Sequence, residues 1–186
     1  MDKTIIKKLN KNFEKTWKTL SLNEKQECIS YMKKTLKEAE GLYKDSLIKL
    51  NAIRPELQAM ITEDMKKEIS YVEKTIDLIT GFKFGKEDRL QEKILLSDNP
   101  QLLFSDIVAS DENYNKADSL VFGILTQANQ AIKHGATKDV IITLNVQTDF
   151  AIKVFERYGD VCKKQTQKID ALFPAFAKDD QKEVTL

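Results

Sequence analysis

The sequence has few of the residues that end regular structure, with three prolines and six glycines among 186 residues. Both residues mark turns, and an all-β protein of this length would need many more of them. Lysine, glutamate, leucine, isoleucine and alanine are abundant, and most of these favour helices. This composition predicts a few long helices joined by few loops.

Cysteine and histidine are also scarce, with two cysteines and one histidine. Cys28 and Cys162 make neither a disulfide-rich scaffold nor a Cys-x-x-Cys metal pair, so we expect two reduced thiols, with one long-range disulfide as the alternative. A single histidine, His134, excludes the paired Glu-x-x-His motifs of di-iron bundles. The sequence therefore predicts no metal and no cofactor.

Long hydrophobic runs are missing as well. Stretches such as Val140-Ile141-Ile142 are far shorter than the roughly 18 residues that cross a bilayer. The first twenty residues carry lysines throughout and no continuous apolar segment, so no secretory signal is visible. These features predict a cytoplasmic protein without a transmembrane segment.

Charge of one sign is not in excess, because 30 Lys and Arg face 29 Asp and Glu for a net charge of +1. Only Arg54, Arg89 and Arg157 carry guanidinium groups, which argues against base reading and bidentate phosphate capture. A nucleic-acid partner is therefore not expected. The first twenty residues depart from the balance, since six lysines there face Asp2 and Glu14.

Apolar residues recur at helical spacing along most of the chain. One helix is predicted from Thr4 to Leu20, with its lysines opposite an apolar face that includes Trp17. A Ser21-x-x-Glu24 capping box begins a second helix, which Pro55 should end. The third helix has Pro55 or Thr62 as its alternative starting point. Its apolar stripe consists of Leu57, Ile61, Met65, Ile69, Val72, Ile76 and Ile79.

The least regular region is the central third, where Gly81 and Gly85 indicate a break and Gly81 a left-handed helix cap. One or two short helices are expected near residues 86–108, the second of them capped by Asn99 and begun by Pro100. Phe82 and Phe84 have two interpretations. They pack onto the end of the bundle or form an exposed contact patch.

Two further helices are expected after residue 110. The first ends at His134-Gly135, and the second is capped by Thr137 and stopped by Pro174. Residues 140–146 contain β-branched side chains that would also suit a strand, but no partner strand is evident, so we assign them to helix.

These patterns predict an all-α fold, an up-and-down antiparallel bundle of four long helices with the short helices inserted near residues 86–108. Residues 1–176 should form a single helical-bundle domain, and residues 177–186 a mobile polar tail. The three-and-four spacing of the apolar residues predicts shallow helix crossings.

Motifs for catalysis are missing from the sequence. It contains no Gly-x-Ser-x-Gly elbow, and the segment from Gly81 to Lys86 lacks the spacing of a phosphate loop. Adjacent carboxylates such as Glu63-Asp64 lie at polar helix starts, where solvation explains them. We expect no enzyme activity, although a pocket built from lysine, glutamate and tyrosine stays open as an alternative.

The leading hypothesis is a non-catalytic protein that acts through protein–protein interaction or assembly, by contact with a protein partner or by self-association. The alternative is a carrier or surface binder of a lipid or other apolar ligand, held in the bundle interior or at an anionic membrane by the basic first helix. The candidate interaction surface consists of Lys7, Lys11, Lys15, Lys18, Phe82 and Phe84.

Overall fold

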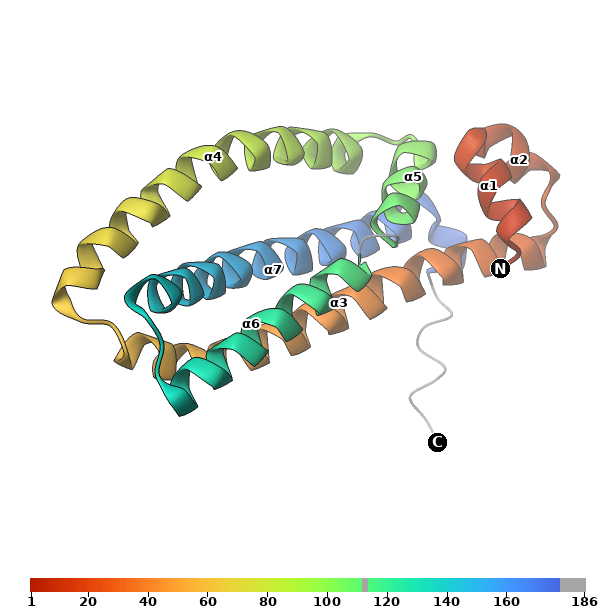
Figure 1. The fold of residues 1–186 in the computed structure, drawn as a ribbon. Coiled ribbons are helices and arrows are strands. Elements are labelled where there is room, and N and C mark those ends of the chain that lie inside the picture. Colours follow the sequence, from red (N-terminus) through yellow and green to blue (C-terminus); the bar gives the residue numbers. More distant parts are fainter. Residues whose placement is uncertain (112–113, 178–186) are drawn as a thin grey trace. The chain divides into compact units, whose positions relative to one another are not determined.

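The computed structural model describes residues 1–111 and 114–177, and of residues 82–84, 111 and 114–116 it describes the backbone alone. Every regular element in the described part is helical, so the all-α prediction is confirmed (Figure 1). The elements are α1 (Lys3–Lys11), α2 (Phe13–Thr19), α3 (Leu22–Ala59), α4 (Glu63–Leu96), α5 (Pro100–Asp111), α6 (Tyr114–His134), α7 (Lys138–Leu172) and the 3-10 helix η1 (Pro174–Phe176).

The chain divides into two compact units. Unit 1 consists of Met1–Glu40, Gln91–Asn113 and Asp160–Leu186, and unit 2 of Gly41–Leu90 and Tyr114–Gly159. The long helices α3, α4 and α7 each contribute residues to both units. Residues 178–186, the greater part of the predicted tail, lie outside the described residues.

The first predicted helix is divided in two. Asn12 has extended backbone angles (φ −155°, ψ 91°) that end α1, and its side chain accepts a hydrogen bond from the amide of Lys15 in α2. Gln101 in α5 holds this junction together. Its Nε2 donates to the carbonyl of Asn10 at 2.7 Å, and its Oε1 accepts from the amide of Phe13. The apolar periodicity was correct, but the cap chemistry of asparagine ends the helix.

The prediction that Pro55 ends the second helix was wrong, because α3 continues through it to Ala59. Proline inside a helix costs about 3 kcal/mol, through a missing hydrogen bond and a clash with the preceding turn. Ile53 and Leu57, on either side of it, are both buried. Burying each of these side chains is worth about 1.5–3 kcal/mol, which offsets the cost of the proline.

Two predicted helix starts are confirmed. The amide of Ser21 donates to Glu24 Oε2 at 2.8 Å, and the amide of Glu24 donates to Ser21 Oγ at 3.3 Å, so the capping box is reciprocal. Of the two possible starts of the third helix, the structure uses Thr62. The amide of Met65 donates to the Thr62 carbonyl at 3.1 Å, and α4 begins at Glu63.

The two glycine signals have opposite outcomes. Gly135 has φ 76°, and it follows α6 directly, as predicted. Gly81 and Gly85 lie inside α4, so the predicted break and the separate helix starting near residue 86 were wrong. Each glycine within a helix costs about 1 kcal/mol relative to alanine, which is too little to end a helix of 34 residues.

The remaining helix assignments are confirmed. The Asn99 side chain accepts from the amide of Gln101 at 2.9 Å, and α5 begins at Pro100. Residues 140–146 are helical within α7. Ile141, Ile142 and Val146 are buried there, so tertiary packing rather than β propensity determines the conformation of this segment.

In unit 2, α7 lies between α4 on one side and α3 with α6 on the other (Figure 1). One buried cluster joins α3, α6 and α7 and consists of Ile53, Leu57, Ala128, Ala131 and Leu144. The other joins α4 and α7 and consists of Met65, Ile141, Ile142 and Val146, with Ile69, Val72 and Ile76 packed against it. Alanines in the first cluster let α6 approach its neighbours closely.

A buried asparagine joins α7 to the end of α3. Asn145 is 5% exposed, and its Nδ2 donates to the carbonyls of Ile141 at 2.9 Å and Leu57 at 3.2 Å. Leu57 is in the last turn of α3, and its carbonyl also accepts from the amide of Met60 at 3.2 Å, just beyond the end of the helix. The side chain of Asn145 therefore supplies part of the C-terminal cap of α3.

Replacing Asn145 with alanine should lower the free energy of unfolding by about 1–3 kcal/mol, because the two buried hydrogen bonds that its side chain donates are lost. The matched control is Asn129→Ala, since Asn129 makes the same bond to the carbonyl four residues earlier at 2.8 Å but is exposed. Urea unfolding of both variants measures the difference. Equal losses in the two variants would contradict the capping role of Asn145.

Candidate interaction surfaces

The four lysines of the predicted surface are all exposed, but they do not form one helical stripe. Lys7 and Lys11 belong to α1, whereas Lys15 and Lys18 belong to α2 beyond the break at Asn12. Lys18 Nζ also lies 2.6 Å from Glu14 Oε1, so its charge is partly compensated.

The apolar side of this basic segment is covered within unit 1. Leu9 and Phe13 are buried, and α1 and α2 both contact α5. Trp17 is half-buried in an aromatic cluster, with ring centroids 5.2 Å from Phe13 and 5.0 Å from Phe173. Burial of these side chains leaves the lysines, rather than an amphipathic helix face, available to an anionic partner.

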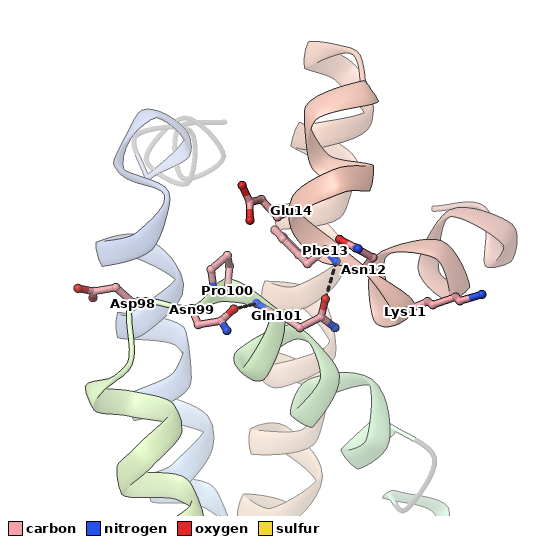
Figure 2. Close-up of a pocket in the computed structure, with 8 residues that line it drawn as sticks. All are labelled: Lys11, Asn12, Phe13, Glu14, Asp98, Asn99, Pro100 and Gln101. Atoms are coloured by element: carbon pink, nitrogen blue, oxygen red, sulfur yellow. Dashed lines mark hydrogen bonds between the residues drawn. The ribbon is translucent and has the colours of Figure 1, made fainter.

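A cavity of about 700 Å³ opens beside the junction of α1 and α2 (Figure 2). The start of α2 and the start of α5 form its walls, because Asn12 and Asn99 cap these two helices and Gln101 ties them together. Its lining residues are Lys11, Asn12, Phe13, Glu14, Asp98, Asn99, Pro100 and Gln101.

Two backbone donors at the walls of this cavity are already engaged. The amide of Phe13 donates to Gln101, and the amide of Gln101 donates to Asn99 (Figure 2). The charged lining groups have mixed signs, since Lys11 is basic and Glu14 and Asp98 are acidic. This arrangement can receive a polar side chain or a peptide turn, and it selects no single sign of charge. The sequence predicted one part of this cavity, the helix cap at Asn99 before Pro100, but not the cap at Asn12.

A polar cluster lies deeper in unit 1. Gln165 is 2% exposed, and its Nε2 donates to Asp106 Oδ2 at 2.6 Å and to Gln91 Oε1 at 3.1 Å. Gln91 Nε2 donates to the same Asp106 oxygen at 2.9 Å. Burial, helped by the negative charges of Glu40 and Asp106, raises the pKa of the Cys162 thiol to about 11. A protonated thiol is a poor nucleophile and metal ligand.

The side chains of Phe82 and Phe84, the apolar part of the predicted surface, lie outside the described residues. Exposed apolar side chains are nevertheless present on the same helix. Tyr71 is 74% exposed, Leu78 is 68% exposed and Ile79 is 67% exposed. The prediction that Ile79 belongs to the core stripe of its helix was wrong.

We define the α4 face as the exposed side of α4 that carries Tyr71, Thr75, Leu78 and Ile79. At 100° per residue, Leu78 points about 160° away from Ile76, which packs against the cluster shared with α7. The helix therefore has a second apolar side. Sequence reasoning missed it, because an apolar residue in a helix does not say which side a neighbour covers.

His134 is exposed at the end of α6. Across the described residues, His, Cys, Asp and Glu side chains do not gather in the groups of three or more that hold a metal ion. Within the same residues, no helix combines the length and apolarity required to cross a bilayer. Comparison with known proteins found no match to a family model, to a curated protein or to a solved structure.

Proposed function

We propose that this protein is a non-catalytic helical protein that acts through protein–protein interaction or assembly, using the α4 face. The observation that supports this proposal is the exposure of Tyr71, Leu78 and Ile79, each by two thirds or more, on one side of one helix. Single exposed apolar residues are common on monomeric proteins, whereas adjacent ones on one face mark interaction sites.

Energetics favour a partner for this face. Fully burying a leucine or isoleucine side chain is worth about 1.5–3 kcal/mol, and tyrosine adds a large, rigid contact surface. Tyrosine is also among the residues enriched at the centres of protein interfaces. The α4 face thus offers a compact group of anchor residues.

We further propose that the long helices form the up-and-down antiparallel bundle that the sequence predicts. Two contacts in unit 2 support opposite directions for α3 and α7. Arg54 pairs with Asp149 at 2.7 Å, and Asn145 reaches Leu57 further along α3. Helices α4 and α7 instead point in the same direction. Glu68 of α4 pairs with Lys138 at the start of α7, and Asp77, further along α4, pairs with Lys153, further along α7. If the direction of the helices alternates in the order α3, α4, α6 and α7, then α3 and α7 are antiparallel and α4 and α7 are parallel, as these contacts require.

A photo-crosslinking amino acid placed at Leu78 tests the interaction in cells that make the full chain. We expect a discrete crosslinked species, because the side chain at position 78 should lie against a partner. The matched control is the same amino acid at Ile48, which is 60% exposed on α3. Equal background from both positions would contradict the proposed role of the α4 face.

A second candidate function is binding to an anionic surface through the lysines of α1 and α2, which is favoured by their exposure. Because Leu9 and Phe13 are buried, this binding would be electrostatic and sensitive to salt. Sedimentation with phosphatidylcholine vesicles, with and without phosphatidylserine, separates the two functions. Binding that requires phosphatidylserine and is lost in a Lys7→Glu, Lys11→Glu variant would support this candidate.

The other form of this alternative, a ligand carried in the interior, has less support from the structure. The space between α4 and α7 near Ile76 and Phe150 is about 10 Å³. That volume is close to the minimum for one water molecule, so an acyl chain would have to separate these two helices.

A further inference from the structure

The α4 face has the spacing of a helix–helix seam. Tyr71, Thr75, Leu78, Gly85 and Arg89 follow the alternating steps of four and three residues, with position 82 completing the repeat. This spacing lets two helices pack along their length in a coiled-coil-like manner. The seam lies wholly in unit 2, so one contiguous part of the molecule presents it.

Two glycines lie along this seam. A Cβ atom built at Gly81 or Gly85 would meet nothing within 4 Å, so the surface beside both is open. Glycines one helical turn apart let another backbone approach closely, because no side chain intervenes. A helix is therefore a better fit to this seam than a loop or a bulky side chain.

The charges along the seam select the direction of a second α4. In a parallel pair, the seam residue Arg89 would lie beside Arg89 of the other copy, which repels, and Lys74 would lie beside Ile79 of the other copy instead of a carboxylate. In an antiparallel pair centred on residue 80, Tyr71 faces Arg89 of the other copy. Lys74 lies on the same flank as Asp88 of the other copy. The two-fold axis makes each of these favourable contacts occur twice.

The groups required for these contacts are accessible. Lys74 and Arg89 are exposed, and the Asp88 side chain is 62% exposed while it also pairs with Arg157. On the opposite flank, Ile79 lies beside Ile79 of the other copy. On the flank of Lys74 and Asp88, Gly81 lies beside Gly81 of the other copy. Charge, apolar contact and backbone clearance all agree with one arrangement.

We infer that α4 pairs antiparallel with α4 of a second copy of this chain, about a two-fold axis near residue 80. This inference rests on the proposed function and names the partner of the α4 face. Lys74 and Asp88 determine the direction of pairing, whereas Leu78 and Ile79 supply the buried apolar contact.

Sedimentation equilibrium of the full chain tests this inference. We expect a monomer–dimer equilibrium that Leu78→Asp weakens by about 100-fold or more, because both copies place a carboxylate in the seam. Lys74→Glu should weaken it about tenfold, and adding Asp88→Lys should restore it. Leu78→Met, which keeps the apolar character, is the matched control, and circular dichroism checks that each variant is folded.

Oxidation of an Ile79→Cys variant gives a second readout, since the inferred axis places the two cysteines together. A disulfide-linked dimer is expected from Ile79→Cys and not from Ile48→Cys. A monomer at all concentrations, or a dimer insensitive to Leu78→Asp, would overturn the inference. If position 78 then crosslinks to a different protein, the proposed function stands without the self-association, whereas no crosslink at all removes both.

Discussion

Replacing Phe104 with alanine is expected to lower the free energy of unfolding by about 3–5 kcal/mol, the range for a buried phenylalanine. Phe104 is fully buried in α5. Its ring centroid lies 5.5 Å from that of Phe13 and 6.5 Å from that of Tyr31, so one side chain joins α5 to α2 and α3. Alanine would leave a cavity and remove both aromatic contacts.

Phe122 provides the matched control, because it is a phenylalanine inside a helix with 72% of its surface exposed. Phe122→Ala should change the stability by less than about 0.5 kcal/mol. Thermal unfolding should show Phe104→Ala melting roughly 6–20 °C lower, at the 2–4 °C per kcal/mol typical of this chain length. A loss below about 1 kcal/mol for Phe104→Ala would contradict the assignment of an aromatic core to unit 1.

The helical class and several helix ends could be predicted from the sequence because they depend on neighbouring residues. The capping box at Ser21, the cap at Asn99 and the left-handed Gly135 are all local arrangements of two or three residues. Local rules failed where packing opposed them. Pro55 lies inside a helix because the buried residues on either side of it offset its cost, whereas Gly81 lies inside a helix because one glycine costs only about 1 kcal/mol.

Long-range contacts were beyond sequence reasoning for a different reason. Gln101 binds the backbone of Asn10 and Phe13, which are 91 and 88 residues away in the sequence. No local sequence pattern predicts partners at such a distance. The predicted lysines are exposed, but the break at Asn12 divides them between two helices. The α4 face was missed because Ile79 fits an apolar stripe by spacing, whereas the stripe residues that pack against the cluster shared with α7 extend only as far as Ile76.

The protein is expected to lose stability steeply above pH 9, because its buried thiols resist ionisation in the folded state. Burial raises the pKa of Cys28 to about 12 from an ordinary value of 9.0. A thiol with a raised folded-state pKa stabilises the fold fully below pH 9, and this contribution is lost as the pH rises toward 12. Each pH unit between 9 and 12 lowers the free energy of unfolding by about 1.4 kcal/mol, which amounts to about 3 kcal/mol for Cys28 between pH 9 and pH 11.

Cys162, with a pKa of about 11, adds a similar loss over the first part of the same window. Lysines and tyrosines also titrate at high pH, so the measurement compares wild type with Cys28→Ala, Cys162→Ala. Alanine lowers the stability at every pH through lost packing, but it removes the thiol-dependent part of the slope. Urea unfolding at pH 8 and at pH 10.5 should therefore show a larger difference between the two pH values for wild type than for the variant.

Thiol reactivity provides an independent measure of the same burial. Relative to an ordinary cysteine, folded Cys28 should contain about a thousandfold less thiolate at pH 8, because its pKa is three units higher. Reaction with a chromogenic disulfide should be slow in buffer and fast in guanidinium chloride, with Cys28→Ala and Cys162→Ala separating the two sites. Rapid labelling of Cys28 in the folded protein, together with equal pH slopes for wild type and the double variant, would show that α3 opens around this residue and that its burial does not control stability at alkaline pH.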